Sequence, residues 1–165
     1  MTGKEAAKAK GKEIQLVVFR LRNEEFGVEI GSVLEISRVL EITRIPQAPS
    51  FIEGVIDLRG QVIAVVDLAR QFGLPAQKQQ SLTARIVVVE VAGQTVGLLV
   101  DQVPGVLKIE QENIEPTPEL IQTEIKRDYI KGVGKLGERL IILLELNNVL
   151  APHEIEAVGT VKKLQ

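Results

Sequence analysis

The chain has 165 residues, of which 45% are hydrophobic and 25% charged, a composition that predicts a folded domain with an ordinary solvated surface. It contains no Cys and one His, so disulfides, thiolate metal sites and sites that need two imidazoles are excluded. The net charge of −2 and the aromatic content of 3% disfavour a nucleic-acid binder, which usually has a basic excess and stacking rings.

Residues 1–13 are rich in Lys, Ala and Gly and lack the apolar core of a signal peptide. We therefore expect a flexible tail on a cytoplasmic protein. The longest unbroken aliphatic run, residues 140–144, is far shorter than the roughly 20 apolar residues of a membrane-spanning helix. Direct membrane insertion is not expected.

The sequence contains an internal duplication, since two ungapped blocks of its first half match two blocks of its second half in the same order. The matching blocks are residues 16–39 with 86–109, and residues 51–68 with 129–146. In each pair of blocks a glycine of one copy meets a glycine of the other: Gly27 meets Gly97, and Gly54 meets Gly132. The duplication predicts two structurally similar halves.

Each copy has the pattern of about five short β-rich strands separated by polar or glycine-containing turns. The expected strands are residues 14–22, 25–30, 35–45, 54–58 and 61–67 in the first copy, and 84–91, 94–100, 103–109, 131–136 and 139–145 in the second. So many short strands in roughly 65 residues leave exposed edges unless the sheet closes on itself. The sequence therefore predicts an all-β fold of two similar five-stranded barrels with short helices.

We expect the first β-barrel subdomain over residues 14–80 and the second over residues 81–150. Exchange of a strand across this boundary remains open. Asp67 is expected to cap a short helix that ends before Gly73. For the C-terminal segment, residues 151–165, a helix and an irregular segment are both open, because its apolar spacing is interrupted by a glycine.

No motif of a known catalytic site occurs in the sequence, whether GxSxG, a P-loop or GxGxxG. The single His153 lies in a polar segment, and no serine has the context of a triad. Asp57, Asp67 and Asp101 could supply a carboxylate pair, but their spacing implies neither burial nor close approach. We therefore expect no catalytic residue, no metal and no cofactor, and a binding module rather than an enzyme.

Two charged residues are candidates for contact with a partner. Arg59 lies in a hairpin turn, whereas the matching position of the second copy is Gly137, and an arginine held on a tight turn is preorganised for contact. The alternative is an ordinary polar turn. Glu35 lies among aliphatic residues, so it is either the outward residue of an alternating strand or an anion at an interface.

Four blocks in order resemble the CheW family of bacterial chemotaxis coupling proteins. The most specific is PSFIEGVIDLRGQVIAVVDL at residues 49–68. The others are EEFGVEIGSVLEI at 24–36, VGLLVDQVPGVL at 96–107 and YIKGVGKL at 129–136. The resemblance covers about residues 14–150. The family commonly has Asn where this chain has Asp57, whose charge could weaken or reorient Arg59.

The resemblance implies two SH3-like barrels and a non-catalytic adaptor. Its expected partners are the regulatory domain of the histidine kinase CheA and the cytoplasmic tip of methyl-accepting chemotaxis receptors, which would recruit the protein to the inner face of the membrane. Carried over by position, the kinase-binding residues are Ile30, Gly31 and Val33. The receptor-binding residues are Glu35, Gly54, Arg59, Ile86 and Val106.

Two alternatives remain. One is a CheW-like coupling protein of another pathway, such as twitching motility or gene regulation. The other is a double barrel that binds nucleic acid, which the acidic charge balance and the low aromatic content disfavour.

Overall fold

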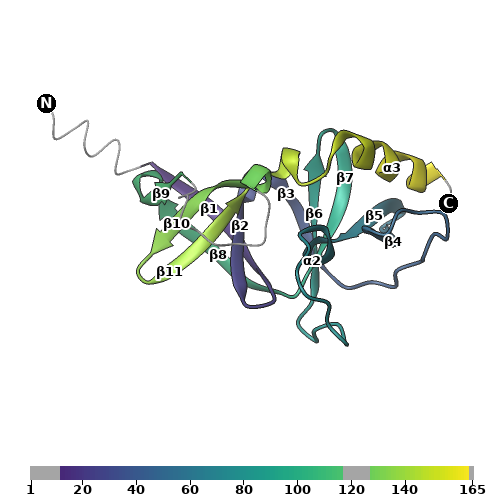
Figure 1. Cartoon of the computed structure of the whole chain (residues 1–165), viewed down its shortest axis with the longest axis horizontal. Coiled ribbons are helices and arrows are strands. Elements are labelled where there is room, and N and C mark those ends of the chain that lie inside the picture. The colour runs from purple at the N-terminus through teal and green to yellow at the C-terminus, as the bar shows by residue number, and fades with distance from the viewer. Residues whose placement is uncertain (1–11, 117–126, 164–165) are drawn as a thin grey trace, which may run out of the picture.

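The computed structural model describes residues 12–116 and 127–163 and shows two β-sheets with short helices at their junction and at one end (Figure 1). The first-half strands are β1 (Glu13–Leu21), β2 (Glu24–Glu29), β3 (Val33–Arg38), β4 (Ile52–Leu58) and β5 (Gln61–Asp67). The second-half strands are β6 (Arg85–Val91), β7 (Gln94–Val100), β8 (Gln102–Glu110), β9 (Ile114–Glu115), β10 (Ile130–Leu136) and β11 (Arg139–Leu144). Residues 1–11, most of the expected tail, lie outside the described residues.

Each sheet curls back on itself. The first has the order β8-β1-β2-β11-β10-β9, and the chain joins its two ends through the 3₁₀ turn η2 (Gln111–Asn113). The second has the order β3-β6-β7-β5-β4, and its ends meet where Thr43 and Val55 exchange both backbone hydrogen bonds, at 2.8 and 2.9 Å. We name these barrel A and barrel B. The prediction of two similar small barrels in an all-β fold is confirmed.

The halves of the sequence exchange their first hairpins. Barrel A contains the hairpin β1–β2 of the first copy together with β8–β11 of the second, whereas barrel B contains β6–β7 of the second copy together with β3–β5 of the first. Neither residues 14–80 nor residues 81–150 form a barrel alone. In place of two contiguous subdomains, each barrel combines strands of both copies. A repeat in the sequence cannot distinguish these arrangements, because every hairpin has the same pattern in both.

Matching glycines mark the place where each exchanged hairpin meets its barrel. Gly27 of β2 lies opposite Leu143 of β11 in a parallel pair, and Gly97 of β7 lies opposite Val65 of β5 in the equivalent pair. A Cβ atom at Gly97 would come within 2.7 Å of a methyl group of Ile86. The ladder shows no register shift at either glycine, so both serve close packing rather than the bulge or bend that glycine inside a strand often marks.

The largest hydrophobic cluster lies between the barrels, and each barrel has a smaller cluster of its own. In β1, Leu16 and Val18 point into barrel A, while Val17 and Phe19 point into the shared cluster. Both faces of the strand are therefore buried, which explains why it has a continuous rather than an alternating apolar run. Phe72 and Tyr129 stack at 5.1 Å at this junction.

Asp67 caps the helix α2 (Leu68–Gln71) by accepting a hydrogen bond from the backbone of Arg70, as expected. By the duplication, Leu68 matches Leu146, but the second copy forms only a 3₁₀ turn there, η4 (Leu146–Asn148). The C-terminal segment forms the helix α3 (Pro152–Lys163), which packs against β4, β5 and β7 through buried Val158 and Val161. Among the described helices, none is long and apolar enough to span a bilayer.

Candidate protein-interaction surface

The three aspartates that could have formed a carboxylate pair have separate structural roles. Asp57 accepts a hydrogen bond from the backbone of Gly60 at 2.7 Å and closes the β4–β5 turn. Asp67 caps α2, and Asp101 forms an ion pair with Arg22 at 3.0 Å. The geometry therefore gives no support for acid–base chemistry at these carboxylates.

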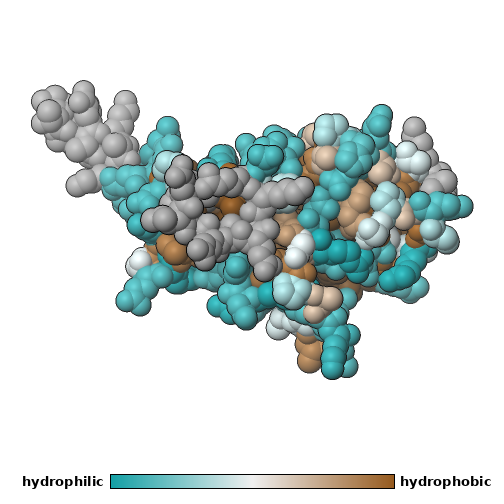
Figure 2. Space-filling model, in the orientation of Figure 1, coloured by the Kyte–Doolittle hydropathy of each residue, from teal (hydrophilic) through white to brown (hydrophobic). Residues whose placement is uncertain are grey.

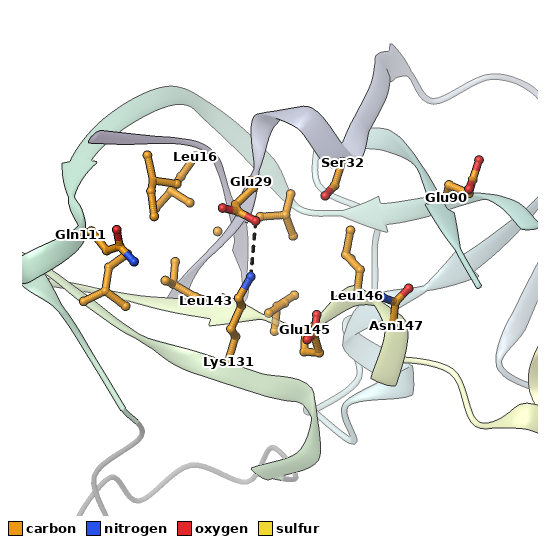
Figure 3. Close-up of a pocket in the computed structure, with 15 residues that line it drawn as sticks. Leu16, Glu29, Ser32, Glu90, Gln111, Lys131, Leu143, Glu145, Leu146 and Asn147 are labelled. Atoms are coloured by element: carbon orange, nitrogen blue, oxygen red, sulfur yellow. Dashed lines mark hydrogen bonds and ion pairs between the residues drawn. The ribbon is translucent and has the colours of Figure 1, made fainter. Parts of the chain in front are cut away.

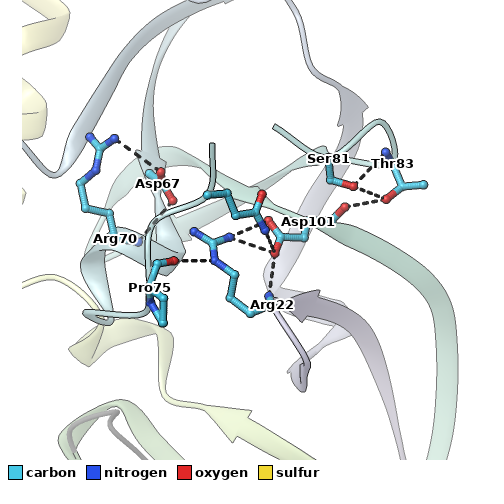
Figure 4. A network of polar contacts seen from close by, with 8 residues as sticks. Arg22, Asp67, Arg70, Pro75, Ser81, Thr83 and Asp101 are labelled. Atoms are coloured by element: carbon cyan, nitrogen blue, oxygen red, sulfur yellow. Dashed lines mark hydrogen bonds and ion pairs between the residues drawn. The ribbon is translucent and has the colours of Figure 1, made fainter. Parts of the chain in front are cut away.

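Asp101 is the centre of a polar network that holds the connection between the two copies (Figure 4). Its carboxylate accepts hydrogen bonds from the backbone and the guanidinium of Arg22 and from the side chain of Gln77. Arg22 also donates to the carbonyl of Pro75, and Thr83 donates to the carbonyl of Asp101. These contacts fix the connector against the β1–β2 turn, so the network is structural.

A cavity of about 410 Å³ opens at one end of barrel A (Figure 3). Its wall includes Leu16 and Leu143 from the barrel interior, and its polar groups include Glu29 and Lys131, which form an ion pair at 3.3 Å. Among the described residues that line this cavity there is no histidine. The cavity therefore offers aliphatic contact and a neutralised charge pair.

The clearest candidate for partner recognition is the pair Arg59 and Glu35. Arg59 is the first residue of the two-residue β4–β5 turn, with a φ of +52°, and Gly60 follows with a φ of +88°. Its guanidinium forms an ion pair with the carboxylate of Glu35 on β3, and its side chain is 74% exposed. Asp57 is engaged with the turn backbone, so Glu35, rather than Asp57, is the carboxylate paired with Arg59.

This ion pair crosses the seam of barrel B, because β3 and β4 are the two ends of its sheet. Arg59 and Glu35 are 24 residues apart in sequence. Their strands lie side by side because the barrel closes at Thr43 and Val55. The equivalent positions in the second copy are Gly105 and Gly137, which cannot form an ion pair. The scaffold is therefore duplicated, whereas this charge pair is not.

Glu35 is not the outward residue of its strand. Its side chain is 26% exposed, whereas the flanking Leu34 and Ile36 are 59% and 40% exposed. The aliphatic residues thus face outward and the carboxylate is partly shielded, which removes the outward-residue interpretation. Exposed aliphatic side chains beside a held charge are typical of an interaction surface. The sequence does not identify Leu34 and Ile36 as surface residues, because apolar and polar residues do not alternate regularly in the run V-L-E-I.

Two of the expected receptor-binding residues are buried. Gly54 lies on β4 at the seam, where a Cβ atom would stand 2.4 Å from the carbonyl oxygen of Thr43. Ile86 has 0% exposure and packs inside barrel B. Both residues therefore lie beneath the surface of barrel B, and their expected part in receptor binding stays a prediction.

Val106 is 48% exposed, but it lies on β8 of barrel A and not on the barrel that holds Arg59. It occupies the position equivalent to Ile36, so the third strand of each copy presents one exposed aliphatic side chain at the same place. The structure therefore joins Glu35 and Arg59 directly and leaves Val106 as a related feature on the other barrel.

The expected kinase-binding residues lie close together, in the 3₁₀ turn that follows β2 and at the first residue of β3. Ile30 and Gly31 belong to the 3₁₀ turn η1 (Ile30–Ser32), and Ile30 is 41% exposed. Val33 is partly buried and packs against the shared hydrophobic cluster. On the face drawn in Figure 2, hydrophilic side chains predominate and apolar surface lies in separate patches.

Comparisons with known proteins give one consistent result. A family model described as "CheW-like domain" matches residues 15–154. The chain is 36% identical to "Chemotaxis protein CheW" of Klebsiella aerogenes, covering 90% of this chain and 89% of that protein. It is 39% identical to "Probable chemotaxis protein CheW" of Rhizobium etli, covering 87% of this chain and 91% of that protein.

A solved structure agrees with these sequence matches. The crystal structure of the scaffolding protein TtCheW from Thermoanaerobacter tengcongensis superposes with a TM-score of 0.76 and 38% identity, covering 84% of this chain and 88% of that one. The match extends over both barrels, since the family model spans nearly every described strand. The chain therefore belongs to the CheW-like family.

Proposed function

We propose that this protein is a non-catalytic adaptor that couples chemoreceptors to the histidine kinase CheA in bacterial chemotaxis. The observation that carries the proposal is the exposed Arg59, paired with Glu35 and flanked by the outward-facing Leu34 and Ile36. Family membership and the names of the matched relatives support the chemotaxis setting.

The receptor is assigned to this surface of barrel B. A receptor tip that is a helical hairpin presents an apolar ridge, which fits beside Leu34 and Ile36, while Arg59 binds a carboxylate or a carbonyl of the receptor. The ion pair with Glu35 holds the guanidinium in place beforehand, which lowers the entropic cost of binding. Gly54 and Ile86 act indirectly, by setting the position of the seam and of β3.

The kinase is assigned to the segment Ile30–Val33. Ile30 provides exposed apolar surface, and a Cβ atom added at Gly31 would meet nothing within 4 Å, so the backbone there is open to a partner. Because Val33 packs against the shared cluster, its replacement by Asp would also disturb the fold. Ile30→Asp is therefore the cleaner test of this contact.

The deciding experiment is co-sedimentation of this protein with a CheA-type kinase and receptor-containing membranes, with kinase autophosphorylation measured in the same samples. Recovery of all three components, and higher kinase activity only when this protein is present, is the expected result. Binding to the kinase without the receptor would instead indicate an adaptor of another pathway, and binding to neither would contradict the proposal.

Two variants separate the two surfaces. Arg59→Ala should weaken receptor binding by roughly 1–3 kcal/mol, the range of an interface hot spot, and leave kinase binding unchanged. Ile30→Asp should weaken kinase binding and leave receptor binding unchanged. Leu82→Asp is a matched control, because Leu82 is a fully exposed connector residue outside both surfaces. If Arg59→Ala bound the receptor normally, Arg59 would be an ordinary polar residue of the turn and not a receptor contact.

A further inference from the structure

The two barrels differ in what covers one matching face. In barrel B, α3 packs against β4, β5 and β7, and its Val158 and Val161 join the cluster that contains Val55 and Ala64. Figure 1 shows α3 lying along this end of the molecule. The equivalent strands of barrel A are β10, β11 and β2. Among the described residues, neither α2 nor α3 packs against these three strands to a comparable extent.

The matching face of barrel A has a groove of about 450 Å³. Its apolar floor consists of Val133, Leu140 and Ile142, of which Leu140 is 52% exposed, whereas Val133 and Ile142 are buried. By the duplication these three residues match Val55, Val62 and Ala64, which lie in or against the cluster that α3 joins. The groove therefore lies where barrel B seats a helix.

A polar residue at the rim of each face strengthens the correspondence. In barrel B, Gly159 of α3 faces Gln94, whose amide nitrogen would lie 3.4 Å from an added Cβ atom. The residue of barrel A that matches Gln94 is Glu24, which also lines the groove. One carboxylate oxygen of Glu24 is buried and has no hydrogen-bond partner among the described residues. A hydrogen-bond donor from an incoming helix would remove this deficit.

We propose that the groove formed by β2, β10 and β11 of barrel A is a docking site for an amphipathic helix of a partner protein. The helix carries a stripe of aliphatic side chains, as α3 does, and a donor such as lysine opposite Glu24. Leu140 and Ile142 are larger than Val62 and Ala64, so the helix lies further from the sheet than α3 does from barrel B. This site is separate from the surfaces assigned to the receptor and the kinase.

The test uses the full chain with labelled Ile, Leu and Val methyl groups and a synthetic peptide as the probe. The peptide has the sequence of residues 151–163 with Gly159→Lys, which raises helix propensity and supplies the donor for Glu24. Titration should give saturable NMR shifts at the methyl groups of Val133, Leu140 and Ile142. Leu140→Glu should reduce the affinity at least tenfold.

The control variant is Leu82→Glu, an equally polar change at a fully exposed residue of the connector, which should bind the peptide like the unmodified chain. Shifts confined to Val55 and Val62 would mean that the peptide only replaces α3 on barrel B, and would overturn the proposal. Absence of shifts at millimolar peptide, or unchanged affinity in Leu140→Glu, would overturn it as well. Self-association that is lost in Leu140→Glu without peptide binding would assign the groove to a second copy instead.

Discussion

The two barrels share their strand arrangement and differ in the side chains placed on it. At the seam of barrel B, Glu35 and Arg59 form an ion pair, whereas barrel A has glycines at both matching positions. Barrel A instead has an ion pair of 3.3 Å between Glu115 of β9 and Lys135 of β10, two strands that are neighbours in its sheet. The comparison teaches that duplication preserved the closure of the sheet and left the exposed turns free to acquire different contacts.

The connector shows the same asymmetry. Arg22 and Asp101 tie residues 73–84 to barrel A, but the matching positions of the other copy are Ala92 and Gly31. After the second copy the chain forms α3, which covers barrel B. The same point in the duplicated scaffold thus leads into a loop in one copy and into a helix in the other.

The largest effect is expected at the shared closure of the barrels. Gly54→Ala should lower the free energy of unfolding by about 3 kcal/mol, since its Cβ atom would collide with the backbone of Thr43 as well as with the side chain of Ile42. Urea unfolding measures this loss, and Gly31→Ala, which meets nothing within 4 Å, is the control. Weakened receptor binding in a Gly54→Ala protein of unchanged stability would show instead that Gly54 contacts the receptor.

A smaller effect is expected at the connector, where only one copy has the ion pair. Asp101→Asn should cost about 1–2 kcal/mol of stability, because the hydrogen bonds from Arg22 lose their charged acceptor. Thermal unfolding compared with that of Glu112→Gln, a change at an exposed carboxylate, measures the cost. Equal stability of the two variants would mean that the connector does not need this network.

Arg59→Gly converts the turn of barrel B into the form found in barrel A, where Gly137 has a φ of +63°. A left-handed backbone is unfavourable for arginine, so this variant should be more stable by up to about 1 kcal/mol while its receptor binding falls. Denaturation and co-sedimentation on the same preparation show both changes. A variant that loses stability would indicate that the ion pair with Glu35 outweighs the backbone strain.

The smallest effect concerns Glu25, whose pKa is lowered from the ordinary 4.5 mainly by the hydrogen bond from Arg139. A carboxylate with a lowered pKa in the folded state contributes stability above its ordinary pKa, and that contribution disappears as the pH falls through the folded value. Barrel B has Thr95 and Gln61 at the matching positions, so the contribution belongs to barrel A alone.

We therefore expect Glu25→Gln to destabilise the protein by less than about 1 kcal/mol at pH 7, with a difference that narrows below pH 4.5. Unfolding curves of both proteins across this range measure the narrowing. A difference that is independent of pH would assign the effect to packing and not to charge.

Part of the interaction surface was predictable from the sequence. Arg59 was identified by its contrast with Gly137, and the structure places it on an exposed turn. Its partner Glu35 was identified as a candidate, but not as its ion-pair partner, because closure of the barrel brings the two strands together. The burial of Ile86 could not be deduced, since an isoleucine in a strand fits both faces of a small barrel equally well.

The sequence by itself determined the turns, the duplication and most of the strands, because these depend on local apolar patterning and on glycine placement. The third strand is an exception, since it was expected over residues 35–45 and is Val33–Arg38 in the structure. Only the tertiary structure decided that β1–β2 and β6–β7 are exchanged between barrels, since equivalent hairpins make equivalent hydrogen bonds in either arrangement. It also decided that Leu34 and Ile36 face outward. Which side chains of β3 face outward depends on the register of β3 with β6, and this register shifts between Val33 and Glu35. A register depends on both strands, so the sequence of β3 alone does not determine it.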